Sequence, residues 1–325
     1  MNTILPEESP LHVADATKNR YIGITLAGKG STAEVWYAIP RATLSGTDLP
    51  VDVVSLRSRV CAVKLYRLYA SRIYIKNELP AIKRLQTLSG HLRARFTEPL
   101  DFSDEAEKDD PCWFAMKVVQ GFTLTQLRKA IFLSKRTVPE EFVFHMYIQL
   151  HEALKFLHTS DPPMTKGDLV AVNIMIDPTT EDVPGFPNIK LIDFGGAQVG
   201  EVGLLLSDNA MDHEWYCIYR TIYDLAMLNL YMRVHQRLNL RSWGLGYVLA
   251  ARRCLDGSNL EQVMNLQERL PRVLKITRHY ASPEALQAIE RLLEETRKSI
   301  EISFPTDQQI LDALNGSVST TSSRL

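Results

Sequence analysis

Five polar residues of this chain stand in the order that phosphoryl transfer from ATP requires: Lys64, Glu78, Asp168, Asn173 and Asp193. The strongest local signal is at Asp193, which follows an apolar run and precedes Phe and Gly. Such a pattern predicts a strand that delivers a carboxylate to a glycine-hinged turn. Because Mg²⁺ prefers oxygen ligands, this carboxylate is a candidate magnesium ligand, and ATP-dependent phosphoryl transfer is the first hypothesis.

Asp168 and Asn173 lie five residues apart in a segment, residues 166–176, that ends in a short apolar strand. We expect Asp168 to accept the proton of a substrate hydroxyl, or to orient that hydroxyl towards the γ-phosphate. Asn173 would then supply an amide oxygen to a magnesium ion that Asp193 also binds. Asp and Asn also begin turns for local hydrogen-bonding reasons, but turn chemistry alone does not account for this spacing followed by a strand and a second turn.

Gly28 and Gly30 lie between two predicted strands, where glycines let the backbone close over phosphates without obstruction by a Cβ atom. A purely structural strand turn is the alternative. Downstream, residues 60–64 predict a strand that ends in Lys64. Alternation along that strand places Lys64 on the same face as Ala62, pointing towards a nucleotide, whereas a surface lysine is the alternative.

Glu78 follows Lys64 by 14 residues, in a helix-like segment at residues 74–85. It could pair with Lys64 and hold that ammonium on the phosphates, and a solvent-exposed glutamate is the alternative. Pro80 complicates the helix, because an interior proline removes a backbone hydrogen bond. Either the helix bends, or its regular part begins beside Glu78.

The elements that must position these residues change in character along the chain. Before Lys64, short strand-like runs alternate with Gly, Pro and Ser, which predicts an antiparallel sheet. Beyond Gly121, apolar residues recur every three or four positions, as in a helix expected to end at His158. Further helix-like segments are expected at residues 217–237, 259–276 and 282–299. We therefore expect an α+β protein of two lobes, divided into a flexible leader (1–19), a small antiparallel-sheet N-lobe (20–119), a larger helical C-lobe (120–315) and a disordered tail (316–325).

The composition limits the classes of binding partner that are expected. Lys and Arg number 37 against 38 Asp and Glu, so the formal net charge of −1 gives no field that would draw the chain to nucleic acid or an anionic membrane. The four cysteines form no C-x-x-C pair, which favours reduced thiols. The first residues lack the apolar core of a secretory signal, and no stretch approaches the roughly 18 apolar residues of a membrane span. We expect an intracellular, cytoplasmic location and no nucleic-acid or membrane partner, with the oligomeric state left open.

The ordered motifs resemble those of the eukaryotic-type protein kinase superfamily over roughly residues 20–300. The resemblance implies a two-lobed kinase fold, ATP and Mg²⁺ as cofactors, and a protein substrate phosphorylated on Ser or Thr, with Tyr not excluded. It also implies that Met116 is the gatekeeper and that the backbones of Lys117 and Val119 meet the adenine edge. The nucleotide-binding residues that it implies are Gly28, Gly30, Val35, Ala62, Lys64, Met116, Lys117 and Val119. The implied catalytic residues are Asp168, Lys64 and Glu78, and the implied metal ligands are Asn173 and Asp193.

The chain also departs from that family. Lys166-Gly167-Asp168 stands where His-Arg-Asp is usual, so the arginine that reads a phosphate on the activation loop is absent. Val170 replaces the lysine expected two residues after the catalytic Asp, which removes one cation from the transferring phosphoryl group. No Ala-Pro-Glu closes the activation segment, where Glu214 is a stand-in.

Two rival hypotheses follow from these departures. The Gly-Asp pair at residues 167–168 also resembles small-molecule kinases of the aminoglycoside and choline type. A small-metabolite kinase is therefore the first rival, favoured by the weak activation segment. A nucleotide-binding pseudokinase that acts as an interaction module is the second, favoured by Val170. Asp224 resembles the buried helix acid that ties down a catalytic-loop backbone, and an ordinary helix-surface Asp is the alternative there.

Overall fold

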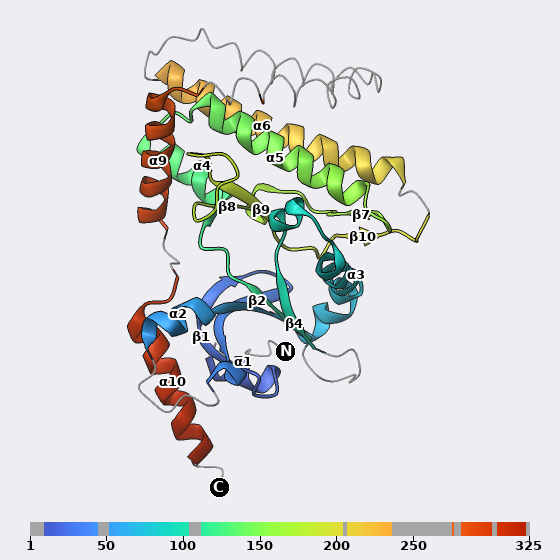
Figure 1. Ribbon diagram of the computed structural model, residues 1–325, viewed down its shortest axis with the longest axis vertical. Helices are drawn as coiled ribbons and strands as arrows, with labels where there is room; N and C mark the ends of the chain where they lie inside the picture. Colours follow the sequence, from blue (N-terminus) through green and yellow to red (C-terminus); the bar gives the residue numbers. More distant parts are fainter. Residues whose placement is uncertain are drawn as a thin grey trace, which may run out of the picture. The chain divides into compact units, whose positions relative to one another are not determined.

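The computed structural model describes residues 10–44, 52–103, 112–203, 207–235, 275, 281–300 and 304–322. The chain divides into two compact units. Unit 1 comprises Met1–Leu79, Glu98–Val118 and Glu301–Leu325, and unit 2 comprises Pro80–Thr97 and Val119–Ile300. The expected α+β class, with a small antiparallel sheet and helices, is confirmed (Figure 1).

Unit 1 is built on a five-stranded antiparallel sheet in the order β1-β2-β3-β5-β4. Its strands are β1 (Tyr21–Lys29), β2 (Ala33–Pro40), β3 (Cys61–Tyr66), β4 (Pro99–Phe102) and β5 (Trp113–Lys117). Lys64 of β3 pairs with Val35 of β2 and Phe114 of β5, while Ala62 pairs with Met116. Cross-strand partners share a face, as do residues i and i+2 of one strand, so all five side chains lie on one face of the sheet.

The segment that precedes this sheet is helical in part. Helix α1 (Pro10–Ala16) packs on the sheet, and its Val13 and Ala16 are buried beside Trp36. The two residues lie three apart and therefore share a helix face. The expectation of a flexible leader over residues 1–19 is wrong from Pro10 onward.

Helix α3 (Leu68–Thr87) carries Pro80 in its interior. The helix begins at Leu68, so the alternative that its regular part starts beside Glu78 is wrong. Since Pro80 has no N–H group, it cannot donate to the carbonyl of Lys76, one turn earlier. The boundary between the two units falls at this interrupted turn, between Leu79 and Pro80.

Unit 2 combines long helices with short strands. The helices are α4 (Leu124–Ser134), α5 (Glu140–His158), α6 (Asp208–His235) and α9 (Pro283–Lys298), with short 3-10 turns η2 (His91–Arg95) and η3 (Ala171–Asn173). The strands are β6 (Phe122–Thr123), β8 (Ile174–Asp177) and β9 (Asn188–Leu191) in one sheet, and β7 (Met164–Thr165) with β10 (Gln198–Val199) in another. Helices α5 and α6 run side by side (Figure 1).

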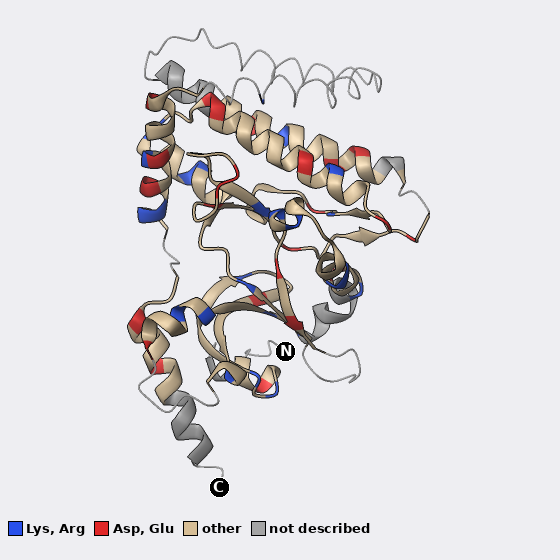
Figure 2. Cartoon of the chain, viewed as in Figure 1, with Lys and Arg blue, Asp and Glu red and all other residues tan. Residues whose placement is uncertain are grey.

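The predicted helix ending at His158 is confirmed as α5, with its apolar stripe buried. The segments expected at 217–237 and 282–299 overlap α6 and α9, whereas 259–276 lies outside the described residues apart from Lys275. Along α9 positive and negative side chains are interspersed (Figure 2). Among the residues that the structure describes, none of the helices is both long and apolar enough to cross a membrane.

The C-terminal region differs from expectation in two ways. Helix α10 (Asp307–Ser322) continues past residue 316, where a disordered tail was expected. It also belongs to unit 1, where it packs on β1 and on α2 (Val53–Arg59), and not to a C-lobe of residues 120–315. The reason is its apolar side: Ile310 is fully buried in a cluster with residues of the sheet.

Candidate functional site

Each unit carries one set of the residues singled out in the sequence. In unit 1, the Nζ atom of Lys64 donates to both carboxylate oxygens of Glu78, at 3.0 Å and 2.8 Å. Both side chains are buried, at 7% and 1% exposure. The Oη atom of Tyr66 also donates to Glu78, and the ammonium lies 5.1 Å from the centre of the Tyr66 ring. The surface-lysine and exposed-glutamate alternatives are therefore wrong.

A buried ion pair of this kind is poor evidence of stabilisation, because desolvation of both charges offsets much of their attraction. Its geometry has a different use. The carboxylate fixes the ammonium on the sheet face that also carries Val35, Ala62 and Met116. A fixed lysine there is able to bind an anionic group without first losing the rotamer freedom of its long side chain.

The remaining nucleotide-binding candidates lie near strand ends, all of them in unit 1 except Val119. The N–H of Lys117 donates to the carbonyl of Glu98 at 2.8 Å, so this N–H is not available to an adenine edge. Val119 is the next candidate along the chain and begins the second segment of unit 2. Gly28 pairs with Val35, and a Cβ atom built at Gly28 meets no described atom within 4 Å. The fold therefore does not require glycine at that position.

In unit 2, Asn173 links the segments that carry the other two candidates, Asp168 and Asp193. Its Nδ2 group donates to the carbonyl and to Oδ2 of Asp168, at 3.1 Å and 3.0 Å. Its own carbonyl accepts from the N–H of Ile192 at 3.0 Å, one residue before Asp193. The β8–β9 hairpin sets this register, since Ile174 pairs with Leu191. The catalytic-loop candidate and both metal candidates thus lie together.

The residues present fit a magnesium ion. Since the Nδ2 group of Asn173 is used on Asp168, its amide oxygen remains as a neutral oxygen ligand. Asp193 has φ 59°, a left-handed conformation that Asp adopts more readily than most residues, and its Oδ1 accepts from the N–H of Gly195 at 3.2 Å. One carboxylate and one amide leave room for water and phosphate oxygens, as Mg²⁺ usually requires. In the described part of the chain, the candidate site included, no cluster of three His, Cys, Asp or Glu residues could hold a metal.

Lys166 has a role that the sequence did not indicate. Its side chain is fully buried, and its Nζ donates to the carbonyl of Asp168 at 3.1 Å and to the carbonyl of Asp193. The same ammonium lies 5.1 Å from the centre of the Phe194 ring. Lys166 therefore ties the loop that carries Asp168 to the turn that carries Asp193.

Gly167 is required by the fold, and an arginine cannot take its place. Its φ is +79°, and a Cβ atom there would lie 1.8 Å from the carbonyl oxygen of Gly196. A Cβ atom added at Gly196 would likewise lie only 3.2 Å from the backbone nitrogen of Asp168. The close approach of the two loops explains the Gly-Asp pair without reference to the class of substrate.

Glu214 holds the backbone of this loop. Its Oε1 accepts from the N–H of Gly167 at 2.6 Å, and its Oε2 accepts from Nε2 of His158 at 2.7 Å. Glu214 is 1% exposed, and His158 closes α5 beside the Trp215 ring. His158 is thus part of the support of the loop.

The corresponding prediction for Asp224 is wrong. Its carboxylate is partly exposed and pairs with Arg220 and Arg128, so the helix-surface alternative is the one observed. One signal could have found Glu214 instead. It lies four residues before Ile218 and eight before Ile222, on the buried stripe of α6, where an acid needs a partner.

The partly buried thiol of Cys217 is influenced by the charges of the candidate site. Burial raises the pKa of Cys217, and the negative charges of Glu214 and Asp168 raise it further. The first turns of α6 therefore lie within electrostatic range of Asp168. Because the raised pKa keeps the thiol protonated near neutral pH, Cys217 is not an activated nucleophile.

Comparisons with protein-family models and with curated proteins returned no match for this chain.

Glu214→Ala should lower the stability of the folded chain. The change leaves the buried N–H of Gly167 without its acceptor, which costs about 1–3 kcal/mol of the free energy of unfolding. Urea denaturation measures this loss, and Glu290→Ala on the exposed face of α9 is the matched control, expected within about 0.5 kcal/mol of wild type. Glu214→Gln keeps an acceptor oxygen and should recover part of the loss. Equal stability of the Ala and control variants would contradict the role given to Glu214.

Proposed function

We propose that this chain is an ATP- and Mg²⁺-dependent kinase of protein-kinase-like fold that transfers the γ-phosphoryl group to a hydroxyl, most simply a Ser or Thr of a protein. The observation that carries the proposal is the linkage through Asn173. The side chain of Asn173 donates hydrogen bonds to Asp168, and the carbonyl of Asn173 accepts one from the N–H of Ile192, the residue before Asp193. Phosphoryl transfer needs a hydroxyl-orienting carboxylate beside two oxygen ligands for magnesium, and these residues supply that combination.

Each residue has a distinct role in this proposal. Lys64, held by Glu78, binds phosphate oxygens of the nucleotide. Asp168 accepts the proton of the acceptor hydroxyl, or orients it, while Asn173 and Asp193 hold the metal. A Mg²⁺ ion bound together with ATP would neutralise part of the negative charge on the phosphates. Lys166 and Glu214 keep the two loops of unit 2 in register.

A small-metabolite acceptor remains the first alternative substrate class. Gly167 no longer favours it, because contact with Gly196 accounts for that glycine. The pseudokinase alternative is favoured by Val170, which is 40% exposed two residues after Asp168 and provides no cation there. Against it stand the intact contacts of Lys64 with Glu78 and of Asn173 with Asp168.

One experiment separates the three. Purified protein is incubated with γ-labelled ATP and Mg²⁺, alone and with generic protein or metabolite acceptors. Transfer of label to protein hydroxyls supports the proposal, and transfer only to a small molecule favours the metabolite kinase. Nucleotide binding without any transfer, including to water, favours the pseudokinase and contradicts the proposed activity.

We also expect activity that does not depend on phosphorylation of the segment between Asp193 and Glu214. Ser207 is the only hydroxyl-bearing residue there, and Gly167 stands where the arginine that usually binds a phosphate on this segment is expected. Initial rates before and after phosphatase treatment should therefore agree. A loss greater than about tenfold, or about 1.4 kcal/mol of barrier, that is reproduced by Ser207→Ala would refute this expectation.

A further inference from the structure

The C-terminal helix α10 completes a hydrophobic cluster on the sheet of unit 1. Ile310 is fully buried there with Ile24 of β1, Ile39 of β2, and Leu56 and Val60 near α2. Two further contacts fix the segment that leads into the helix. The Phe304 ring meets Tyr37 edge-on at 5.6 Å, and the guanidinium of Arg57 lies 5.4 Å from the centre of the Phe304 ring.

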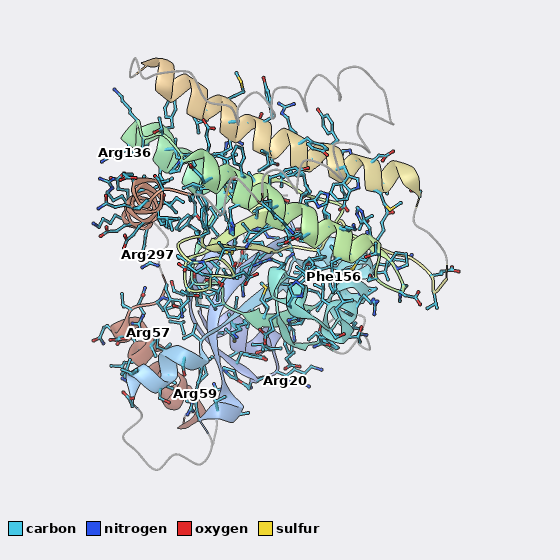
Figure 3. All side chains as sticks on the ribbon, turned by 45° about the horizontal axis from the view of Figure 1, so that its top comes forward. Arg20, Arg57, Arg59, Arg136, Phe156 and Arg297 are labelled. Carbon is cyan, nitrogen blue, oxygen red and sulfur yellow. The ribbon has the colours of Figure 1, made fainter. Side chains whose placement is uncertain are left out.

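The entry to α10 is also bound by charge. Arg57, labelled in Figure 3, forms an ion pair with Asp307 at the first turn of the helix. Thr306 and Gln309 bond to each other's backbone N–H groups, which caps the helix reciprocally. Asp307 in the first turn suits the helix dipole. The helix is therefore held at a defined place on unit 1.

The cluster reaches residues that carry the proposed nucleotide contacts. Val118 packs against it, and Val118 lies between Lys117 and Val119. Tyr37 also packs against it, and Tyr37 pairs with Ala62 across the sheet. By strand alternation and pairing, the cluster thus lies on the sheet face that carries Ala62 and Met116.

We infer that α10 is a positioning element for the nucleotide base. Through the cluster around Ile310, it fixes Val118 and hence the adjoining backbone of Lys117 and Val119. The inference rests on the proposed function, since it assigns those two backbones to adenine. It makes the C-terminal segment part of the ATP-binding machinery, where the sequence predicted a C-lobe end and a disordered tail.

The test compares affinity for ATP with affinity for tripolyphosphate, which lacks the base. Ile310→Ala removes side-chain volume from the cluster and should weaken ATP binding by about tenfold, with tripolyphosphate binding and kcat at saturating ATP changed less than about twofold. Ile310→Leu conserves volume and should restore ATP affinity. Val13→Ala, in the separate cluster around α1, is the matched control for loss of a buried apolar side chain in the same unit.

An equal fall in affinity for both ligands would show a general loss of structure and overturn the inference, as would unchanged ATP affinity. If Ile310→Ala does not fold, Ile310→Val, which lacks one methylene, takes its place. If wild type binds no ATP, the proposed function fails, and hydrogen exchange then tests the positioning alone. Backbone amides of residues 117–119 should exchange about tenfold faster in the Ile310 variant than in Val13→Ala, and equal rates would overturn the inference.

Discussion

Asp193→Asn should abolish phosphoryl transfer and remove the dependence of nucleotide affinity on Mg²⁺. The substitution replaces the carboxylate that we propose as a metal ligand by a neutral amide of the same shape. Metal stabilisation of the charge that develops in the transition state is worth several kcal/mol, and a loss of about 4 kcal/mol lowers the rate about 10³-fold. Thermal-shift titrations with ATP, with and without Mg²⁺, measure binding, and labelled ATP measures transfer.

The structure indicates that Asp193→Asn keeps the local backbone conformation and its hydrogen bonds. Asp193 has φ 59°, and Asn tolerates the left-handed conformation as Asp does. The amide oxygen of Asn can still accept from the N–H of Gly195, and the carbonyl that Lys166 binds is unchanged. Asp224→Asn on α6 removes a carboxylate from the same unit and should retain activity. Wild-type turnover by Asp193→Asn would contradict the metal assignment.

Local motifs were sufficient to predict several of the contacts among the candidate residues. Lys64 and Glu78 were expected to pair from their order and spacing, and they do. Asp168 and Asn173, five residues apart in one loop, are hydrogen-bonded to each other. At so short a separation, the local sequence largely determines the contact. Strand alternation similarly predicted the common face of Ala62 and Lys64, because period two is a property of the strand itself.

Contacts between distant segments could not be predicted in this way. Glu214 and Asp224 are both acids on α6, and only the approach of the Gly167 loop decides which one binds its backbone. Lys166 was not recognised because lysine is seldom fully buried, and its two carbonyl partners lie 2 and 27 residues away.

The same limit explains the C-terminal segment. Arg57 and Asp307, which fix the start of α10, are separated by 250 residues. The apolar residues before 316 form a weak pattern, and the Gly, Ser and Thr that follow are poor helix formers. Helix formation there depends on burial of Ile310 against the sheet. Local helix propensity gives no information about that burial.

Asp168→Asn should lower kcat by about 10²- to 10⁴-fold, the range for a positioned acid or base, with little change in ATP affinity. An amide at this position can still bond to Asn173, so the loop geometry should be kept while the capacity to accept a proton is lost. Asp224→Asn again serves as the control in unit 2.

The division between kcat and binding decides what Asp168 does. A residue that only supported the loop would affect the position of Asn173, and its loss would weaken Mg²⁺-dependent nucleotide binding together with turnover. A residue that acts on the acceptor hydroxyl lowers turnover alone. A fall in ATP affinity as large as the fall in kcat would therefore make Asp168 a structural residue and favour a nucleotide-binding module without transfer activity.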